Sequence, residues 1–349
     1  MPEIPVGILG ATGTVGQRFV QLLVDHPWFK VTALAASDAS AGQAYAEACH
    51  WLLPNPMPIA VRDFVVQPLD QAIDCTLVFS ALPSGVAGPV EEELAHSGAI
   101  VCTNASAHRL DPDVPLLIPE VNAEHTALIE IQRQRRRGSG FIVASANCSA
   151  TQLALALKPL HVTFGLRKVS VVTMQAVSGA GYPGVPALDI LDNVVPFIAG
   201  EEHKLESEPK KLLGRLKKGK VEDAPFAASA QCNRVPVRDG HTECVSVELE
   251  HQPSVREVIA ALEGFSGSPE VSQLPSSPPR PVLVTEQDSR PQPIRDRDAE
   301  AGMSVIVGRV RPCPLLGLKF VVLGHNTLRG AAGGSIHNAE LLVAQGWIA

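Results

Sequence analysis

Residues Pro5-Val6-Gly7-Ile8-Leu9-Gly10-Ala11-Thr12-Gly13-Thr14-Val15-Gly16 decide the fold class of this chain. Positions 5–9 predict a buried strand, positions 10–16 a glycine-rich turn, and positions 17–24 an amphipathic helix. A strand, a tight turn and a helix N-terminus form a cradle for a pyrophosphate, because glycine lets the backbone approach the ligand and the helix end presents free N–H groups. The spacing is GxxGxxG rather than GxGxxG, so the flanking strand and helix strengthen a motif that is only moderate alone.

Further strands follow at 31–36, 75–80, 99–102 and 141–144, separated by helical stretches, which predicts a mostly parallel, doubly wound sheet. Beyond Cys148 the strands expected at 167–177, 245–250, 281–284, 304–310 and 320–323 alternate in polarity, as in an antiparallel or mixed sheet with helices on one side. We therefore expect an α/β protein. A Rossmann-type domain would span 1–147 together with 327–349, because the last helix, expected at 335–345, returns to it. A second, α+β domain would span 148–326.

Composition excludes several classes of function. A chain of 349 residues exceeds the roughly 250–300 at which single cores stop growing, which fits two domains. The net charge of −7 predicts neither a nucleic-acid nor a membrane partner, and the basic run at 133–137 is expected to be a solvated loop. No signal-peptide pattern and no run of roughly 18 apolar residues is found. The seven cysteines lack CxxC pairs and metal-ligand spacing, which predicts no metal site and a reducing cytoplasm.

The stretch Ser145-Ala146-Asn147-Cys148-Ser149-Ala150-Thr151 places a thiol where a strand gives way to an apolar helix. Free N–H groups and the positive end of the helix dipole favour thiolate over thiol at such a position. A small buried cysteine is the ordinary alternative. The small polar neighbours suit a turn that is open to a ligand, so Cys148 is the candidate nucleophile.

Other polar groups follow strand ends, where ligands bind in parallel sheets. Asp38 could accept from a ribose 2′-hydroxyl, whereas Ser37 and Ser40 could bind a 2′-phosphate, so the residues leave NAD and NADP unresolved. The loop at 81–85 and the loop at 104–109 lie at the same expected edge. Arg109 there suits an anionic substrate group, with a surface arginine as the alternative.

A thiol beside a dinucleotide site suggests that thiolate adds to a carbonyl and that nicotinamide exchanges hydride with the adduct. Such a site needs a group that changes charge near neutral pH, and His241, in a turn that enters a strand, is the best candidate. Arg234 nearby could hold a carboxylate by two hydrogen bonds. The charged stretch at 200–211 reads as a solvated helix.

Six segments together resemble aspartate-β-semialdehyde dehydrogenase, in its archaeal and fungal branch more than the common bacterial one. They are Gly10–Gly16, Leu116-Leu117-Ile118-Pro119-Glu120-Val121-Asn122, Ser145–Ser149, Gln175–Gly184, Arg234–Val237 with Gly240–Glu243, and Asn326-Thr327-Leu328-Arg329-Gly330. They run nearly end to end in one order, which makes the match specific.

The resemblance implies that Cys148 is the nucleophile, His241 the acid/base group and Gln175 the group that orients the intermediate. Arg234 and Glu201 would hold the amino-acid end of the substrate, and Arg109, Asn104 and Lys204 its phosphate. The second domain would be the catalytic and dimerisation domain of a homodimer or homotetramer. The residues expected to bind the cofactor are Gly10, Thr12, Gly13, Thr14, Val15, Ser37, Ser40, Ser84, Gly85, Ser178, Gly179 and Asn326.

By this resemblance the chain would reduce L-aspartyl-4-phosphate to L-aspartate-4-semialdehyde reversibly, with NADP, through a Cys148 thioester, as in lysine, threonine and methionine biosynthesis. Relatives carry a basic residue near Ala39 that this chain lacks, so NAD stays possible. One alternative is an acyl-CoA reductase such as malonyl-CoA reductase, in which Glu201 would have no substrate ammonium to bind. Another is a non-catalytic dinucleotide-binding regulator, against which the set of Cys148, Gln175 and His241 argues.

Overall fold

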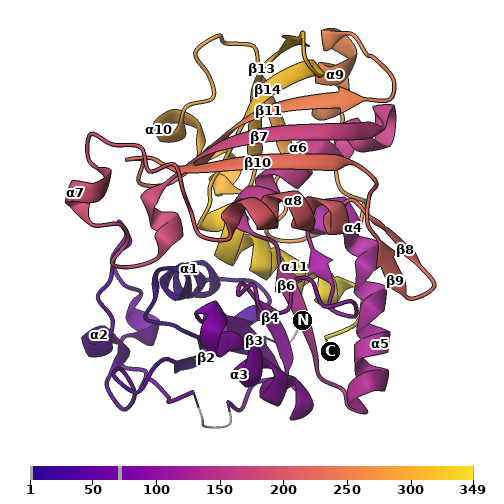
Figure 1. Ribbon diagram of the computed structural model, residues 1–349. Helices are drawn as coiled ribbons and strands as arrows, with labels where there is room; N and C mark the ends of the chain where they lie inside the picture. The colour runs from indigo at the N-terminus through magenta and orange to yellow at the C-terminus, as the bar shows by residue number, and fades with distance from the viewer. Residues whose placement is uncertain (1–2, 70–72, 349) are drawn as a thin grey trace.

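The structure, a computed structural model, describes residues 3–69 and 73–348. Over these ranges two six-stranded sheets and one small hairpin form two lobes, with helix α8 between them (Figure 1). The domain limits expected at residues 1 and 349 lie outside the described residues. Among the helices of the described ranges, none is long and apolar enough to cross a membrane.

The first sheet is the parallel sheet that the opening stretch predicts. Its order is β2-β1-β3-β4-β6-β5, and every neighbouring pair is parallel. Helices or loops cover both faces, and so its inner strands are almost wholly buried. Its strands are β1 (Ile4–Leu9), β2 (Phe29–Ala35), β3 (Leu77–Ser80), β4 (Ile100–Thr103), β5 (Leu116–Leu117) and β6 (Phe141–Ser145).

The helices around this sheet include the last one of the chain, which confirms the expected return of the C-terminus (Figure 1). They are α1 (Thr14–Leu23), α2 (Tyr45–Ala48), α3 (Ser84–His96), α4 (Pro119–Asn122), α5 (Leu128–Arg136) and α11 (Gly333–Ala344), with short turns η1 (Ile59–Val61) and η2 (Ala123–Ala127).

The second sheet is mixed, as expected, with the order β10-β7-β11-β14-β13-β12. The outer pairs β10–β7 and β12–β13 are parallel, and the inner pairs are antiparallel. Its strands are β7 (Leu166–Gln175), β10 (Ala227–Arg234), β11 (His241–Leu249), β12 (Val282–Thr285), β13 (Val305–Cys313) and β14 (Gly317–Gly324), beside the hairpin β8 (Arg215–Lys217) and β9 (Lys220–Glu222).

Helices of this lobe lie at the sheet and at the junction with the first lobe. They are α6 (Cys148–Phe164), α7 (Ala187–Ile190), α8 (Glu201–Leu212), α9 (Val255–Glu263) and α10 (Pro293–Asp296), with short turns η3 (Val177–Ala180), η4 (Val271–Gln273), η5 (Ala299–Gly302) and η6 (Leu328–Ala332). Helix α6 is apolar nearly all round, and its buried side chains join one core that reaches into both sheets. Cys148, the first residue of α6, therefore lies at the junction of the lobes.

The expectation that strand 167–177 continues to Val177 is wrong. β7 ends at Gln175, and residues 177–180 form the turn η3. The Ala176 N–H donates to the ring of His241 and the Val177 N–H to the carbonyl of Val237, so both leave the sheet ladder. Strand β10 was not predicted, because its sequence, AASAQCNR, lacks the apolar alternation of a buried strand.

The basic run at 133–137 is not a solvated loop. Four of its residues form the end of α5, where Arg136 is buried and pairs with Glu92 at 2.7 Å. The Arg133 guanidinium lies 5.1 Å from the centre of the Phe141 ring. Arg133 and Arg136 therefore make contacts within the protein. Long basic side chains can pack their aliphatic part against apolar groups while the charged end finds a partner nearby.

Candidate active site

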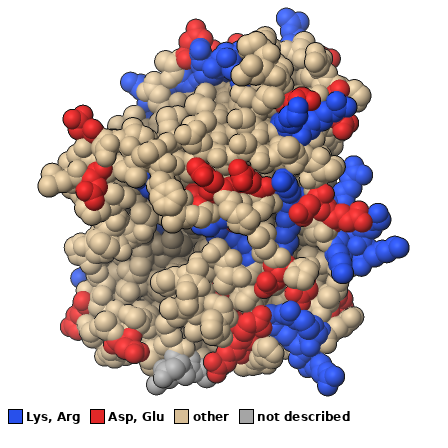
Figure 2. All heavy atoms as spheres, viewed as in Figure 1, with Lys and Arg blue, Asp and Glu red and all other residues tan. Residues whose placement is uncertain are grey.

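A cleft of about 720 Å³ lies between the lobes. Figure 2 shows the surface hollowed there below α8, with Lys or Arg atoms at the inner end of the hollow. The walls come from the glycine turn, the loops after β3 and β4, the starts of α6 and α8, and η3. Of the predicted site residues, those that line it are Gly13, Thr14, Val15, Ser84, Asn104, Arg109, Cys148, Gln175, Ser178, Gly179, Glu201, Lys204, Arg234 and Asn326.

Cys148 is the first residue of α6, as the strand-to-helix pattern predicts. The helix is capped by Asn147, whose side-chain oxygen accepts the N–H groups of Ser149 and Ala150 at 2.9 and 3.1 Å. The Cys148 side chain is partly exposed at the cleft. Its neighbour on the inner side is Gly330, where a Cβ atom would come 2.7 Å from that of Cys148.

His241 lies behind the thiol, fully buried at the start of β11. Its Nε2 is 3.2 Å from the Cys148 Sγ, and its Nδ1 accepts the Ala176 N–H at 3.0 Å. A backbone N–H can only donate, so the neutral ring carries its proton on Nε2 and points it at the sulfur. The ring itself does not line the cleft, which it reaches through Cys148.

The expectation that the helix terminus favours a thiolate is wrong for this pair at rest. Burial and the negative charge of Glu201 raise the pKa of Cys148 to about 12, against the opposing influence of Arg109, the Ser149 N–H and Arg234. Burial and the charge of Arg234 lower the pKa of His241 to about 3. The resting pair is therefore a neutral thiol and a neutral imidazole, because desolvation outweighs the helix end.

Glu201 gathers the polar groups of the cleft floor. Its Oε1 accepts from the side chains of Asn147 at 2.7 Å and Gln175 at 3.2 Å, and its Oε2 from Lys204 at 3.1 Å. Burial would raise the pKa of Glu201, but Lys204 and these hydrogen bonds outweigh it and lower the pKa. Helix 201–212 is thus present but not merely solvated, since Glu201 is 5% exposed.

Arg234 ends strand β10 and lines the same cleft as Glu201. Within the described residues its guanidinium makes one hydrogen bond to protein, to the Ala176 carbonyl at 2.8 Å, so most of its five N–H donors remain for a ligand. A Cβ atom on Gly179 would come within 2.9 Å of this guanidinium and 3.1 Å of the His241 ring. The glycine is therefore needed for the close approach of η3.

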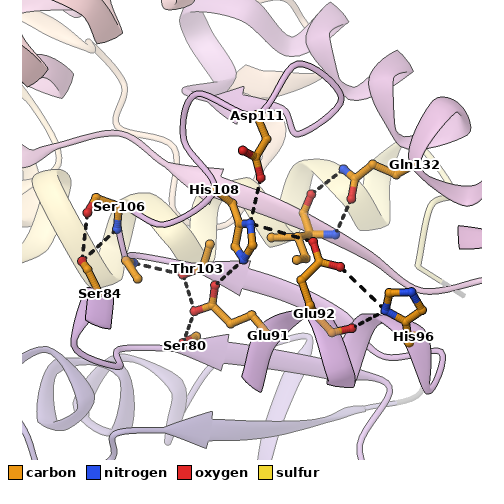
Figure 3. A network of polar contacts seen from close by, with 12 residues as sticks. Ser80, Ser84, Glu91, Glu92, His96, Thr103, Ser106, His108, Asp111 and Gln132 are labelled. Carbon is orange, nitrogen blue, oxygen red and sulfur yellow. Dashed lines mark hydrogen bonds and ion pairs between the residues drawn. The ribbon is translucent and has the colours of Figure 1, made fainter. Parts of the chain in front are cut away.

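Arg109 and Asn104 lie on the loop after β4. A network of polar contacts joins the ends of β3 and β4 to helix α3 and to His108 of this loop (Figure 3). Glu91 of α3 accepts the hydroxyls of Ser80 and Thr103, the last residues of β3 and β4, at 2.6 and 2.7 Å. His108 turns toward the same network and lies 2.9 Å from Asp111. Its neighbour Arg109 lines the cleft instead.

The glycine turn has the geometry of a dinucleotide-binding site. Gly10 has a φ of +70°, and a Cβ there would come 2.7 Å from the Ala81 carbonyl, so only glycine suits. Helix α1 has no side-chain cap and no acidic residue in its first turn, which leaves its N-terminus suited to a pyrophosphate.

Among the residues predicted to bind the cofactor, those that do not line the cleft are Gly10, Thr12, Ser37, Ser40 and Gly85. Ser37 and Ser40 lie in the turn after β2, where the Ser40 N–H donates to the Ser37 carbonyl at 2.8 Å.

Sequence reasoning missed the residues that support the site. Glu208, on α8, accepts from Arg109 at 3.0 Å and from the Asn147 N–H at 2.6 Å. Glu120 and Arg329 form an ion pair whose two side chains are buried. The sequence holds a clue to each of these contacts. Glu208 lies seven residues after Glu201 and so on the same helix face. Glu120 and Arg329 lie in two of the six segments that resemble the family. Within the described ranges, no group of three or more His, Cys, Asp or Glu side chains is arranged to hold a metal ion.

A glycine turn suited to a dinucleotide, a thiol in contact with a histidine and a set of fixed charges meet at one cleft. Together they define a class of protein, a dinucleotide-dependent oxidoreductase. Comparisons identify the family. Residues 5–129 match the family model described as "Semialdehyde dehydrogenase, NAD binding domain", and residues 157–329 match "Semialdehyde dehydrogenase, dimerisation domain".

The chain belongs to the aspartate-semialdehyde dehydrogenase family. The aspartate-semialdehyde dehydrogenase of Archaeoglobus fulgidus is 53% identical over 97% of this chain and 98% of its own. That of Cryptococcus neoformans is 46% identical over 99% of both chains. A crystal structure of the Candida albicans enzyme with NADP superposes with a TM-score of 0.92, at 42% identity over 99% of this chain and 100% of that one. The resemblance to the archaeal and fungal branch is confirmed.

Proposed function

We propose that this oxidoreductase interconverts L-aspartyl-4-phosphate and L-aspartate-4-semialdehyde with NADP(H) and phosphate, through a thioester on Cys148. One observation carries the proposal: a single cleft joins the thiol, the glycine cradle and the opposite charges of Glu201 and Arg234. The reaction would serve lysine, threonine and methionine biosynthesis, as it does in the family that the sequence resembles.

In the reductive direction the sulfur of Cys148 attacks the acyl carbon, the S–C bond forms, and the C–O bond to phosphate breaks. The proton of the thiol leaves with the phosphate. NADPH, when bound, supplies the hydride that reduces the thioester. In the tetrahedral thiohemiacetal that results, the oxygen re-forms the C=O bond as the S–C bond breaks. The sulfur takes a proton, and the semialdehyde leaves with the thiol restored. Covalent catalysis of this kind divides one difficult step into two easier ones.

His241 is the acid/base group of this proposal. At rest its Nε2–H donates to the sulfur, because Nδ1 is occupied by the Ala176 N–H. This hydrogen bond favours the charged form of sulfur at the moment of attack. For Nε2 to take up or release a proton, the ring must pass through a form with a proton on Nδ1, which displaces the Ala176 N–H. Gln175, tied to Glu201 at 3.2 Å, orients the intermediate beside the thiol.

The charged groups divide the substrate into two ends. Glu201 is the partner of the α-ammonium and Arg234 of the α-carboxylate, because an Arg fork matches a carboxylate by two hydrogen bonds. Arg109, Lys204 and Asn104 bind the phosphate. Malonyl-CoA offers no ammonium, so a buried Glu201 carboxylate supports the amino-acid substrate over the acyl-CoA alternative.

NADP is the expected cofactor, held by Gly13, Thr14 and Val15 at the pyrophosphate and by Ser37 and Ser40 at the 2′-phosphate. No basic residue stands between positions 37 and 42. Neutral donors lack charge-assisted bonds, so we expect only a moderate preference for NADP over NAD. Steady-state kcat/KM with each cofactor decides this, and a thousand-fold preference would contradict it.

Substrate assays test the whole proposal. With aspartate semialdehyde, reduction of NADP should depend on phosphate, and malonyl-CoA should support negligible oxidation of NADPH. Turnover of malonyl-CoA with aspartate semialdehyde inert would contradict the substrate assignment and leave the Cys148 chemistry standing.

We also propose a homodimer or homotetramer assembled through the 148–326 domain, with 1–147 and 327–349 as the dinucleotide-binding domain. The match of residues 157–329 to a dimerisation domain supports the assembly. The seven cysteines are all free thiols, which supports a cytoplasmic location. Sedimentation or light scattering tests the assembly, and a monomer at micromolar concentration would contradict it.

A further inference from the structure

Helix α8 carries a stripe of charged side chains at the spacing of one helix face, and all of them except Lys204 are buried. Glu201 and Lys204 at its start face the cleft, and Glu208 and Lys211 follow one and two turns later. Glu208 is 2% exposed and Lys211 is 6% exposed. Charged groups so deeply buried need partners, and theirs are not the substrate. They are the two loops that present Arg109 and Cys148.

Glu208 uses each carboxylate oxygen once. Oε1 accepts from the Arg109 Nη1 at 3.0 Å, and Oε2 accepts from the Asn147 backbone N–H at 2.6 Å. Arg109 in turn donates its Nε–H to the Ser145 carbonyl at 2.9 Å. The turn at 145–147, which delivers Cys148, is therefore held at its carbonyl end by the arginine and at its N–H end by the glutamate.

Two further sets of hydrogen bonds fix the loop that carries Arg109. The Nη2 of Arg109 donates to the Asn104 carbonyl at 2.8 Å. The Lys211 ammonium donates to the carbonyls of Arg109, Asp111 and Val114 at 2.8, 2.7 and 3.0 Å. Three of the five guanidinium N–H donors of Arg109 are thus used in positioning, which leaves two for an anion.

We propose that Glu208 is a positioning residue that sets the phosphate-binding arginine and the nucleophile's turn as one unit. This rests on the proposed phosphate role of Arg109. Glu208 does not line the cleft, so it acts through Arg109 and Asn147. Its two oxygens fix the relative position of the two groups that must meet the leaving phosphate and the acyl carbon of one substrate.

The test measures protection of Cys148 by inorganic phosphate against alkylation by iodoacetamide, which needs neither turnover nor cofactor. Glu208→Gln keeps the size of the side chain but turns an NH₂ group toward one of its two donors. We expect the phosphate concentration for half-protection to rise at least tenfold. The KM for phosphate should rise equally, while the KM for NADP stays within twofold, a split that general loss of stability would not produce.

Glu202→Gln is the matched control on the same helix, since Glu202 accepts from the Cys232 N–H on another face. It should match the parent. Glu208→Asp keeps the charge and shortens the reach, and we expect at least a threefold rise, which can be measured if the Gln variant does not fold.

Arg109→Lys separates the two proposals. If it raises the half-protection concentration while both Glu208 variants stay within twofold of the parent, the role of Glu208 is wrong and the phosphate role of Arg109 stands. If phosphate does not protect the parent protein, the phosphate role of Arg109 fails and this inference fails with it.

Discussion

The Nε2 of His241 lies 3.2 Å from the Sγ of Cys148, although the two residues stand 93 positions apart in the chain. One begins a strand of the second sheet and the other begins the helix that follows the first sheet. This contact thus exists only where the two lobes meet. Any change that moves one lobe against the other should affect this contact first.

The two roles of His241 can be separated by substitution. His241→Ala should lower kcat/KM by about 10²–10⁴-fold, the usual value of a general acid/base. His241→Gln keeps an N–H that can donate to sulfur but cannot change its protonation, so it should stay within a few-fold of the alanine variant. Steady-state kinetics with both variants provide the measurement. A glutamine variant near parental activity would reduce the role of His241 to hydrogen-bond donation.

The reactivity of Cys148 should depend on pH in a way that reports its burial. Burial and Glu201 raise the pKa of this thiol to about 12, so the thiolate fraction still increases at pH 9. The rate of alkylation by iodoacetamide in the free protein should therefore rise through pH 9 without a plateau. A plateau centred below pH 8 would show that the helix end and the arginines outweigh desolvation.

Glu201→Gln should weaken kcat/KM for aspartate semialdehyde by about 1–3 kcal/mol, the range for disrupting a hydrogen bond to a charged group. The amide would turn an NH₂ toward one of the donors that Glu201 now accepts. Steady-state kinetics provide the measurement, with Glu202→Gln as the control. Equal effects of the two variants would contradict the assignment of Glu201.

Gly330→Ala tests the packing against Cys148. The added Cβ would lie 2.7 Å from the Cys148 Cβ and 2.9 Å from its Cα, so the thiol must shift. Displacement of a reacting group by about 1 Å can cost about 10²-fold, and we expect a loss in kcat of that order. Gly88→Ala in helix α3 is the control and should retain activity, because the added Cβ would lie 3.7 Å from the Cβ of Ala107, an ordinary contact distance.

The Glu120–Arg329 pair should dominate the acid stability of the junction. Burial alone would raise the pKa of Glu120, but the charges of Arg329 and His337 lower it to about 2. A carboxyl whose pKa is lower in the folded state than its ordinary 4.5 contributes stability above pH 4.5, and loses it as pH falls toward 2. Glu120→Gln should cost about 3–5 kcal/mol at pH 7, because it leaves Arg329 buried without its charge partner.

Denaturant unfolding of the two variants Glu120→Gln and Glu3→Gln measures this cost. Glu3 pairs with Lys30 at the surface, with both side chains about 60% exposed, and its loss should change stability by no more than about 1 kcal/mol. Similar effects of the two substitutions would contradict the importance of the buried pair.

Much of this architecture was predictable from local pattern. The strand, glycine turn and helix at the N-terminus predicted the parallel sheet, and the strand-to-helix step predicted the position of Cys148. Electrostatics at Cys148 was not predictable, because burial by distant segments decides the pKa of the thiol. Strand β10 was not predicted, because an edge strand of small and polar residues has no periodic pattern of apolar side chains.

The helix at 201–212 is a second case in which local sequence does not predict burial. Its composition is that of a solvated helix, and only its position between two lobes explains why Glu201, Glu208 and Lys211 are buried. Glu201 and Glu208 are seven residues apart and so lie on one helix face, but nothing local indicates that protein loops occupy it. Local sequence predicts elements well, whereas contacts across a lobe junction require the fold.

The most direct test of the central claim is to trap the acyl group. Protein mixed with NADP and aspartate semialdehyde in the absence of phosphate should accumulate an aspartyl thioester on the peptide that contains Cys148, detected by mass spectrometry. Phosphate should remove it with release of aspartyl phosphate, and Cys148→Ala should show neither the adduct nor more than a few per cent of parental kcat/KM. An adduct on another residue, or a Cys148→Ala variant that still turns over, would contradict the account.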